Sequence, residues 1–112
     1  MYGQEQKSAI ADLQSKAAVA TTLLRTIANK NRLLILCHLL ESEKTVNELE
    51  RLIGLRQSAM SQHLAILRRD HLVRTRRKAQ FVYYSLASAE AKAIMTTLYE
   101  LYCTPPKRGG RC

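Results

Sequence analysis

The sequence predicts a mainly helical domain with a β-hairpin wing, that is, a winged helix-turn-helix, in a chain of 112 residues. Three observations support this fold class. Apolar residues recur at helical spacing through most of the chain, two strand-like runs follow the fourth helical segment, and Lys and Arg concentrate around those runs. The predicted order is α-α-α-α-β-β-α. We expect one domain over residues 1–103 and a flexible basic tail over residues 104–112, where Pro, Gly and Arg dominate.

The first three helices follow from periodicity and end signals. The first is predicted over residues 5–28, where no Pro or Gly interrupts the apolar repeat. The second, over residues 31–40, is apolar nearly all round and is therefore expected to be buried. The third begins after Thr45, which forms the capping-box pattern with Glu48, and it ends at Gly54, which can take a left-handed conformation.

The fourth helix, predicted over residues 57–70, has two distinct faces on a helical wheel. Met60, Leu64 and Leu67 form a narrow apolar seam that can pack on the domain. The opposite face carries short hydroxyl, amide and methyl groups with one long cation, which suits close approach to base edges in a major groove. The candidate base-reading residues of this helix are Gln57, Ser58, Ser61, Gln62, His63 and Arg69. For His63, a packing and hydrogen-bonding role is the favoured alternative.

Two strands and a last helix complete the domain. The strands are predicted over residues 73–77 and 81–86, joined at residues 78–80, and Ser88 can cap a last helix over residues 89–102. Long cations at the hairpin suit contacts to the DNA backbone, which position a protein without reading much sequence. The candidate wing and backbone contacts are Arg56, Arg74, Arg76, Arg77, Lys78, Gln80 and Thr45.

The positive charge is concentrated in one segment of the chain. The net charge is +9, and residues 56–86 hold seven Lys or Arg against one Asp, which gives that segment +6. Such a footprint favours nucleic acid as the partner, with an acidic membrane surface as the second choice. No apolar run is long enough to span a membrane and the N-terminus has no signal-peptide pattern, so we expect a cytoplasmic protein that binds double-stranded DNA with steep salt dependence.

The run LLRTIANKNRLLILCHLLESEKTVNELERLIGLRQSAMSQHLAILRRDHLVRTRRKAQFVYYSL, with YELYC after it, resembles the ArsR/SmtB family of bacterial winged-helix regulators. Within that family it is most similar to the branch containing HlyU, BigR and SqrR. The most specific parts are QSAMSQHL, FVYYSL and a pair of cysteines, Cys37 and Cys103. The resemblance implies a homodimer built on the first and last helices that binds an imperfect inverted-repeat operator as a transcriptional regulator; repression and relief of silencing both occur in this branch, and the residues do not separate them. Arg56 departs from the Ser that usually caps the recognition helix, and Ala79 stands where the wing turn often has Gly or Glu.

The resemblance also implies an effector. Regulators of this branch respond to reactive sulfur or oxidants through two cysteines, which implies redox sensing by Cys37 and Cys103 through a reversible bond. Taken alone, Cys37 in LLILCHLL is more typical of an inert buried thiol. Cys112, in the tail, is either a spectator or a partner for thiol exchange. Metal-sensing members of the family carry their ligands on the third or the last helix. Here the third helix lacks Cys and His and the last helix lacks His and Asp, so we predict no metal site and no cofactor.

Other functions fit the sequence less well or equally well. An enzyme is disfavoured because Cys37 and His38 diverge on their helix and no Gly-rich phosphate loop is present. A protein-interaction module is a better rival, although the +6 segment argues against it. Among regulators, an HlyU-like activator that displaces a nucleoid protein without a thiol switch, and a metal-responsive ArsR-type repressor, remain alternatives.

Overall fold

The computed structural model describes residues 2–103, with side chains from residue 9 onward. The predicted basic tail, which includes Cys112, lies outside the described residues. The elements, in chain order, are α1 (Tyr2–Ser15), α2 (Ala17–Ile27), α3 (Lys30–Glu41), β1 (Lys44–Thr45), α4 (Val46–Ile53), α5 (Gln57–Arg69), β2 (Val73–Lys78), β3 (Phe81–Leu86) and α6 (Ala89–Cys103).

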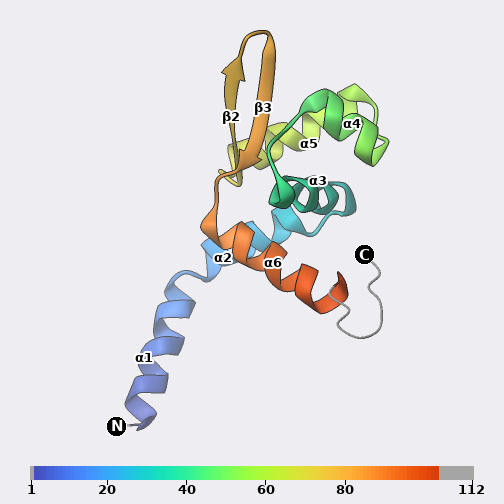
Figure 1. Ribbon diagram of the computed structural model, residues 1–112. Coiled ribbons are helices and arrows are strands. Elements are labelled where there is room, and N and C mark those ends of the chain that lie inside the picture. The colour runs from blue at the N-terminus through green and yellow to red at the C-terminus, as the bar shows by residue number, and fades with distance from the viewer. Residues whose placement is uncertain (1, 104–112) are drawn as a thin grey trace.

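The arrangement is a winged helix-turn-helix, as predicted (Figure 1). The hairpin of β2 and β3 extends from the body as the wing, and β1 adds a third antiparallel strand to β3, giving the order β1-β3-β2. α4 and α5 form the helix-turn-helix beside the wing, and α3 packs against both of them and against α6. α2 and α6 both lie below this unit in the view of Figure 1, each packed on α3, while α1 projects away from it.

The core is formed by the apolar faces that the sequence periodicity indicates. Met60, Leu64 and Leu67 of α5 are buried, so the predicted seam is confirmed. They pack with buried residues from every neighbouring element: Ile27, Ile35, Leu36, Leu39, Leu49, Leu72, Val73, Ala91 and Met95. Burial of these residues fixes which face of α5 is left toward solvent.

The predicted helix signals are also confirmed. Thr45 and Glu48 form the full capping box at the start of α4, and Gly54 ends that helix with a left-handed φ of 83°. The Oγ of Ser88 accepts a hydrogen bond from the Ala91 N–H at the start of α6. Within the described residues, none of the helices is long and apolar enough to cross a membrane.

The prediction of one first helix over residues 5–28 is wrong, because the helix breaks at Lys16. The Ser15 hydroxyl donates to the Asp12 carbonyl at 2.8 Å, and that carbonyl is the acceptor Lys16 would use in a continuous helix. The Lys16 N–H bonds instead to the Leu13 carbonyl, one residue nearer, at 3.0 Å. A side chain that competes for a backbone acceptor therefore divides the segment into α1 and α2.

Two features of the sheet were not predicted. Strand β1 is only two residues long and is set by its pairing with Tyr83 and Tyr84, which no local pattern reveals. The turn between β2 and β3 holds Ala79 at a φ of 58°, a conformation that is costly for a residue with a Cβ.

Candidate nucleic-acid interface

The exposed face of α5 matches the predicted reading face. The seam residues are turned into the core, so the side chains opposite them face solvent. The exposed side chains on α5 that were predicted to read bases are Gln57, Ser58, Ser61, Gln62 and Arg69, and Ala65 is exposed with them. Arg56, at the N-cap, is also exposed and makes no capping hydrogen bond. These are short polar groups on a rigid helix, which is the chemistry required to approach base edges.

His63 is the member of the predicted set that is directed toward the protein. Its side chain is half-buried, and its Nδ1 lies 3.3 Å from Nη1 of Arg32 on α3. Partial burial and the Arg32 charge both lower the pKa of His63, which favours the neutral ring. Because a guanidinium can only donate, Nδ1 must accept, and the ring proton resides on Nε2.

The wing carries four cations, and they are not equivalent. Arg74, Arg77 and Lys78 are exposed and make no hydrogen bond or ion pair within the described part of the chain. Arg76 donates two hydrogen bonds to Glu43, from Nε at 2.9 Å and Nη2 at 2.6 Å. Its guanidinium also lies over the Tyr83 ring, 4.8 Å from the centroid.

The Arg76 contact has an electrostatic consequence. The hydrogen bond from Arg76 lowers the pKa of Glu43, so the carboxylate is charged at neutral pH and offsets the guanidinium. Arg76 therefore holds the wing to the residue before β1, and the wing cations left open to a polyanion are Arg74, Arg77 and Lys78. Gln80 is also exposed, in the turn.

Two other predicted contact residues are engaged by neighbours. The Thr45 hydroxyl accepts from the Glu48 N–H at 3.2 Å in the capping box. Arg69 is bound by the carboxylate of Asp70, with Nε to Oδ1 at 3.0 Å and Nη2 to Oδ2 at 3.4 Å. The Arg69 side chain remains 69% exposed, so it is held along the helix end without being removed from the surface.

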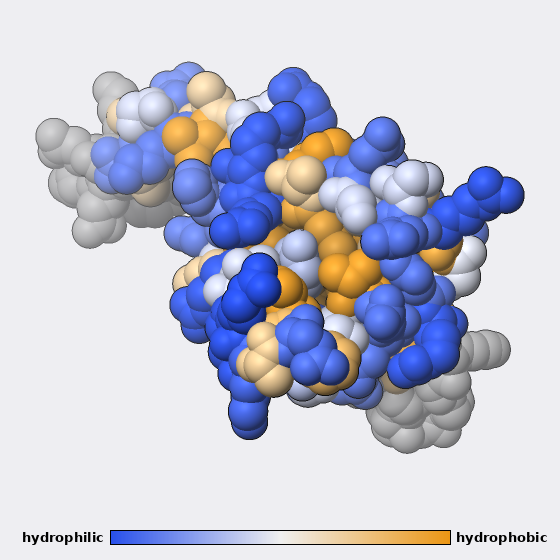
Figure 2. Space-filling model, turned by 90° about the horizontal axis from the view of Figure 1, so that it is seen from above, coloured by the Kyte–Doolittle hydropathy of each residue, from blue (hydrophilic) through white to orange (hydrophobic). Residues whose placement is uncertain are grey.

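A hollow of about 380 Å³ lies between α5 and β3, lined by Ser61, Leu64, Ala65, Arg68, Arg69 and Tyr84. All of these residues except Tyr84 belong to α5, and they give the hollow a mixed lining of polar and apolar groups with two arginines toward the end of the helix. Seen from the wing side, hydrophobic residues form a patch through the middle of the face and hydrophilic residues surround it (Figure 2). The concave surface between helix and wing thus joins the reading face to the basic segment.

The two cysteines predicted to sense redox state lie on helices that pack together. Cys37, on α3, is a half-buried free thiol beside the core. Cys103, at the end of α6, is also half-buried and is disulfide-bonded in the structure, but not to Cys37. α3 packs directly against α6. Among the described residues, no group of three or more His, Cys, Asp and Glu is placed to hold a metal ion.

Sequence reasoning missed four residues that organise this surface: Thr26, Arg32, Glu43 and Asp70. Each acts through a partner distant in sequence, so periodicity does not reveal it. One signal was available, because Asp70 is the one acidic residue in the basic segment 56–86. An isolated carboxylate among seven cations is expected to pair with one of them.

Comparison with known proteins identifies relatives of the whole domain. Residues 29–75 match the family model described as bacterial regulatory protein, arsR family. The chain is 51% identical over 92 residues to the transcriptional activator HlyU of Vibrio cholerae, covering 82% of this chain and 85% of that protein. It is 37% identical over 97 residues to the biofilm growth-associated repressor of Xylella fastidiosa, covering 87% and 85%.

Solved structures agree with these matches. Reduced HlyU from Vibrio cholerae superposes with a TM-score of 0.80 at 50% identity, covering 83% of this chain and 98% of that one. The transcriptional repressor BigR from Xylella fastidiosa superposes with a TM-score of 0.78 at 36% identity, covering 85% and 97%. The similarity therefore extends over the helix-turn-helix, the wing and most of the flanking helices.

Proposed function

The chain belongs to the ArsR family of bacterial regulatory proteins and is a DNA-binding transcriptional regulator rather than an enzyme, and on this premise we propose how it binds DNA. A homodimer places the exposed face of each α5 in a major groove of an imperfect inverted repeat, and each wing lies against the backbone. The observation that carries the proposal is the arrangement of short polar groups on α5 next to three exposed wing cations that make no ion pair within the described residues, Arg74, Arg77 and Lys78. On this proposal the protein acts in the cytoplasm, where a bacterial regulator meets DNA.

The reading residues are Gln57, Ser58, Ser61 and Gln62. Gln can bond bidentately to adenine and Ser can bond to several bases, whereas Ala65 can contact a thymine methyl. Arg56, at the N-cap of α5, and the wing cations contact phosphates. Arg69 becomes available when a phosphate competes with Asp70. Thr45, Arg76 and His63 contribute by holding the domain together, because their polar groups are already engaged.

The dimer forms through the outer helices. α1 projects from the body, and its described apolar side chains are exposed, with Ile10 at 59% and Leu13 at 64%. Leu101 and Tyr102 of α6 are exposed to 69% and 73%. Large apolar side chains gathered on unpartnered helices are typical of a protein interface, and two copies are needed to read an inverted repeat.

A titration of DNA binding tests this proposal. A duplex selected by the protein from a randomised pool, and a scrambled duplex of the same composition, are titrated by fluorescence anisotropy over a range of salt concentrations. We expect preference for the selected duplex and a log K that falls linearly with log salt, by roughly 0.9 per phosphate neutralised. Arg77→Gln should reduce that slope by about one on both duplexes, whereas Gln62→Ala should weaken only the selected one.

Lys92→Gln is the matched control, since Lys92 is an exposed cation in the first turn of α6, outside the proposed DNA-contacting surface of α5 and the wing and ten residues from Tyr102. It should leave the slope unchanged. A flat salt dependence, or equal binding of the two duplexes, would contradict the proposal.

We further propose that the bond state of Cys37 controls DNA affinity through Cys103. Two routes lead to the same bond. With both thiols reduced, an oxidant or a reactive sulfur donor accepts two electrons as the two protons leave, forming Cys37–Cys103. From the disulfide-bonded form, the Cys37 thiolate attacks the Cys103 sulfur, and the sulfur previously bonded to Cys103 leaves as a thiolate, with no net oxidant.

Support for this switch comes from the packing of α3 on α6, which makes the bond a direct link between the buried helix and the proposed dimer helix. Such a link changes the relative position of the two α5 helices, and a difference of a few kcal/mol between dimer states changes occupancy about a hundredfold. One solved relative is HlyU described as reduced. The named relatives include an activator and repressors, and we propose repression here.

Cysteine variants test the switch. DNA affinity is measured for the wild type, Cys37→Ser and Cys103→Ser, each fully reduced and then treated with peroxide or a sulfur donor. Release should occur in the wild type alone, and intact mass should distinguish loss of two hydrogens from sulfur addition. Release that persists in both variants would reject the thiol switch while leaving the DNA-binding proposal untouched. Release by zinc, in place of the sulfur donor, would favour the metal-responsive alternative.

A further inference from the structure

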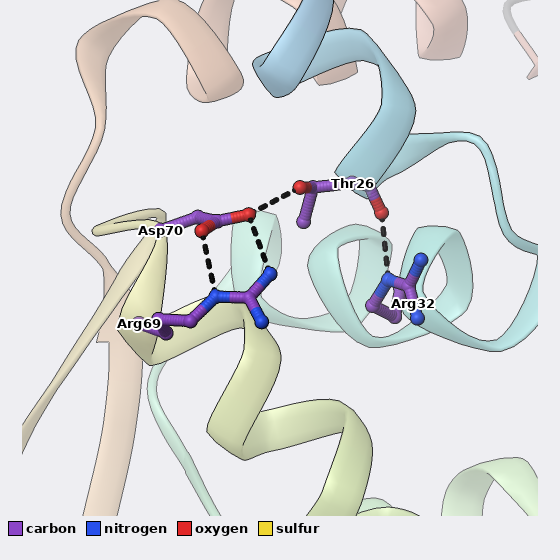
Figure 3. A network of polar contacts seen from close by, with 4 residues as sticks. All are labelled: Thr26, Arg32, Arg69 and Asp70. Atoms are coloured by element: carbon purple, nitrogen blue, oxygen red, sulfur yellow. Dashed lines mark hydrogen bonds and ion pairs between the residues drawn. The ribbon is translucent and has the colours of Figure 1, made fainter.

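A polar network joins α2, α3 and α5 at two points (Figure 3). At the first, the Thr26 hydroxyl, near the end of α2, donates to Oδ2 of Asp70 at 2.5 Å. Asp70 is the residue that follows α5, and its two oxygens also hold Arg69. At the second point, Arg32 on α3 donates from Nε to the Thr26 carbonyl at 2.7 Å and extends Nη1 toward His63, in the middle of α5.

The partners in this network are well placed to be held in one geometry. Thr26 is buried, at 5% exposed, and the Asp70 side chain is 13% exposed. The hydrogen bonds from Arg69 and Thr26 lower the pKa of Asp70, so its carboxylate is charged at neutral pH. Bonds to a charged group are stronger than those between neutral groups.

Asp70 is itself set by the end of α5. The Leu72 N–H bonds to the Leu67 carbonyl at 2.9 Å, and the His71 N–H bonds to the Arg68 carbonyl at 3.0 Å, which together form a Schellman motif. Leu67 and Leu72 are both in the core. The Asp70 carboxylate therefore has a fixed position relative to the reading face of α5. Because Thr26 of α2 is bonded to this carboxylate, a displacement of α2 also displaces the reading face.

Apolar packing between α2 and α5 contributes less to their relative position than these hydrogen bonds do. α2 packs on α3, and α5 packs on α3 and α4. Between α2, the turn after α5 and the start of α6, a groove of about 740 Å³ is open, with Thr22, Leu23, Asp70 and His71 among its lining residues. Where a groove replaces packed side chains, directional hydrogen bonds set the relative position of the helices.

We propose that Thr26, Arg32 and Asp70 are positioning residues that hold the reading helix α5 at a set orientation to α2, so that the arrangement of the dimer helices determines how α5 meets DNA. This inference rests on the proposed function. It adds that Asp70 has two roles: it anchors α5 to α2 and it restrains Arg69. Removing the anchor should reduce discrimination between sequences more than it reduces backbone binding.

Matched variants of Thr26 provide the test. Thr26→Val keeps the shape and removes the hydroxyl, whereas Thr26→Ser keeps the hydroxyl. Affinity for the selected and the scrambled duplex is measured for each, with thermal unfolding as the check on folding. We expect Thr26→Val to bind the selected duplex about tenfold more weakly, the size of one hydrogen bond to a charged group, and the scrambled duplex within about twofold of wild type. Thr26→Ser should restore selective binding.

Asp70→Asn provides a second test, in which the expected change is a gain in affinity for the scrambled duplex. The amide still accepts from Thr26 but releases Arg69 from its ion pair, so the scrambled duplex should bind more tightly, with a salt slope steeper by about one. A purely structural role would instead weaken both duplexes in parallel with the loss of folding. The inference is overturned if Thr26→Val lowers both affinities equally or neither, or if Asp70→Asn leaves the slope unchanged. If the wild type itself fails to prefer the selected duplex, the proposed function fails and not this inference alone.

Discussion

Arg76 illustrates how a neighbour changes what a single side chain can do. By composition it is one of seven cations in the basic segment, and its place in the wing predicts a phosphate contact. The structure pairs it with Glu43, whose pKa is lowered by that hydrogen bond, and stacks it on Tyr83. The pKa of Glu43 is lower in the folded chain than in the unfolded chain. The stabilisation of the wing by this pair is therefore fully present at pH values above the unfolded pKa of Glu43, and it is lost as the pH falls through the folded pKa.

The prediction at this scale concerns salt dependence. Glu43→Gln should free Arg76 for phosphate, strengthening binding to any duplex and steepening the salt slope by about one. Arg76→Gln should leave the slope near that of the wild type, because its charge is already compensated. Anisotropy titrations over a salt range check both, with Arg77→Gln as the matched uncompensated cation. If Arg76→Gln reduces the slope as much as Arg77→Gln does, the pairing does not govern binding.

Secondary-structure elements show which local signals are decisive and which are overridden. The bounds of α4 and α5 follow from a capping box, a glycine stop and an apolar seam, all visible in sequence. The break at Lys16 arises from a hydroxyl that takes a backbone acceptor, and β1 arises from pairing with β3. The break and the strand each depend on which of several available hydrogen-bond partners a polar group uses, so helical periodicity alone cannot predict either of them.

The end of α5 yields a stability prediction. His71 holds the left-handed position of the Schellman motif with a φ of 62°, where glycine is usual. His71→Gly should raise the free energy of unfolding by about 1 kcal/mol, because glycine avoids the clash between Cβ and the following carbonyl. Urea denaturation measures the change. His71→Ala, which keeps a Cβ, is the control and should show no such gain. Equal stability of the two variants would place the strain elsewhere.

At the scale of the whole molecule, the short polar groups and free cations lie on α5 and the wing, whereas the outer helices α1 and α6 carry the most exposed of the leucines. Leu13 on α1 and Leu101 on α6 are exposed to 64% and 69%. An isolated chain gains nothing from leaving such side chains in water, whereas burial of one leucine in an interface contributes roughly 1.5 to 3 kcal/mol. This division supports a dimer whose interface lies away from the wing.

The corresponding prediction is a change in assembly. Leu13→Lys and Leu101→Lys should each weaken dimerisation by roughly tenfold or more, as measured by sedimentation velocity over a concentration series. Leu52→Lys is the matched control, because Leu52 is half exposed on α4, within the helix-turn-helix. It adds the same charge and should leave the dimer intact. A dimer weakened by the control and not by the other two would move the interface to the reading side.

The sequence by itself determined the elements that depend on near neighbours: the apolar seam of α5, the capping box of α4, the hairpin and the concentration of positive charge around it. These require only residues a few positions apart, whose spacing is visible in a linear chain. The tertiary structure alone decided which cations are compensated and what anchors the reading helix. Arg76 with Glu43 is separated by 33 positions and Thr26 with Asp70 by 44. A hydrogen bond depends on distance and direction in space, and those are set only when α2, the wing and α5 have packed around one core.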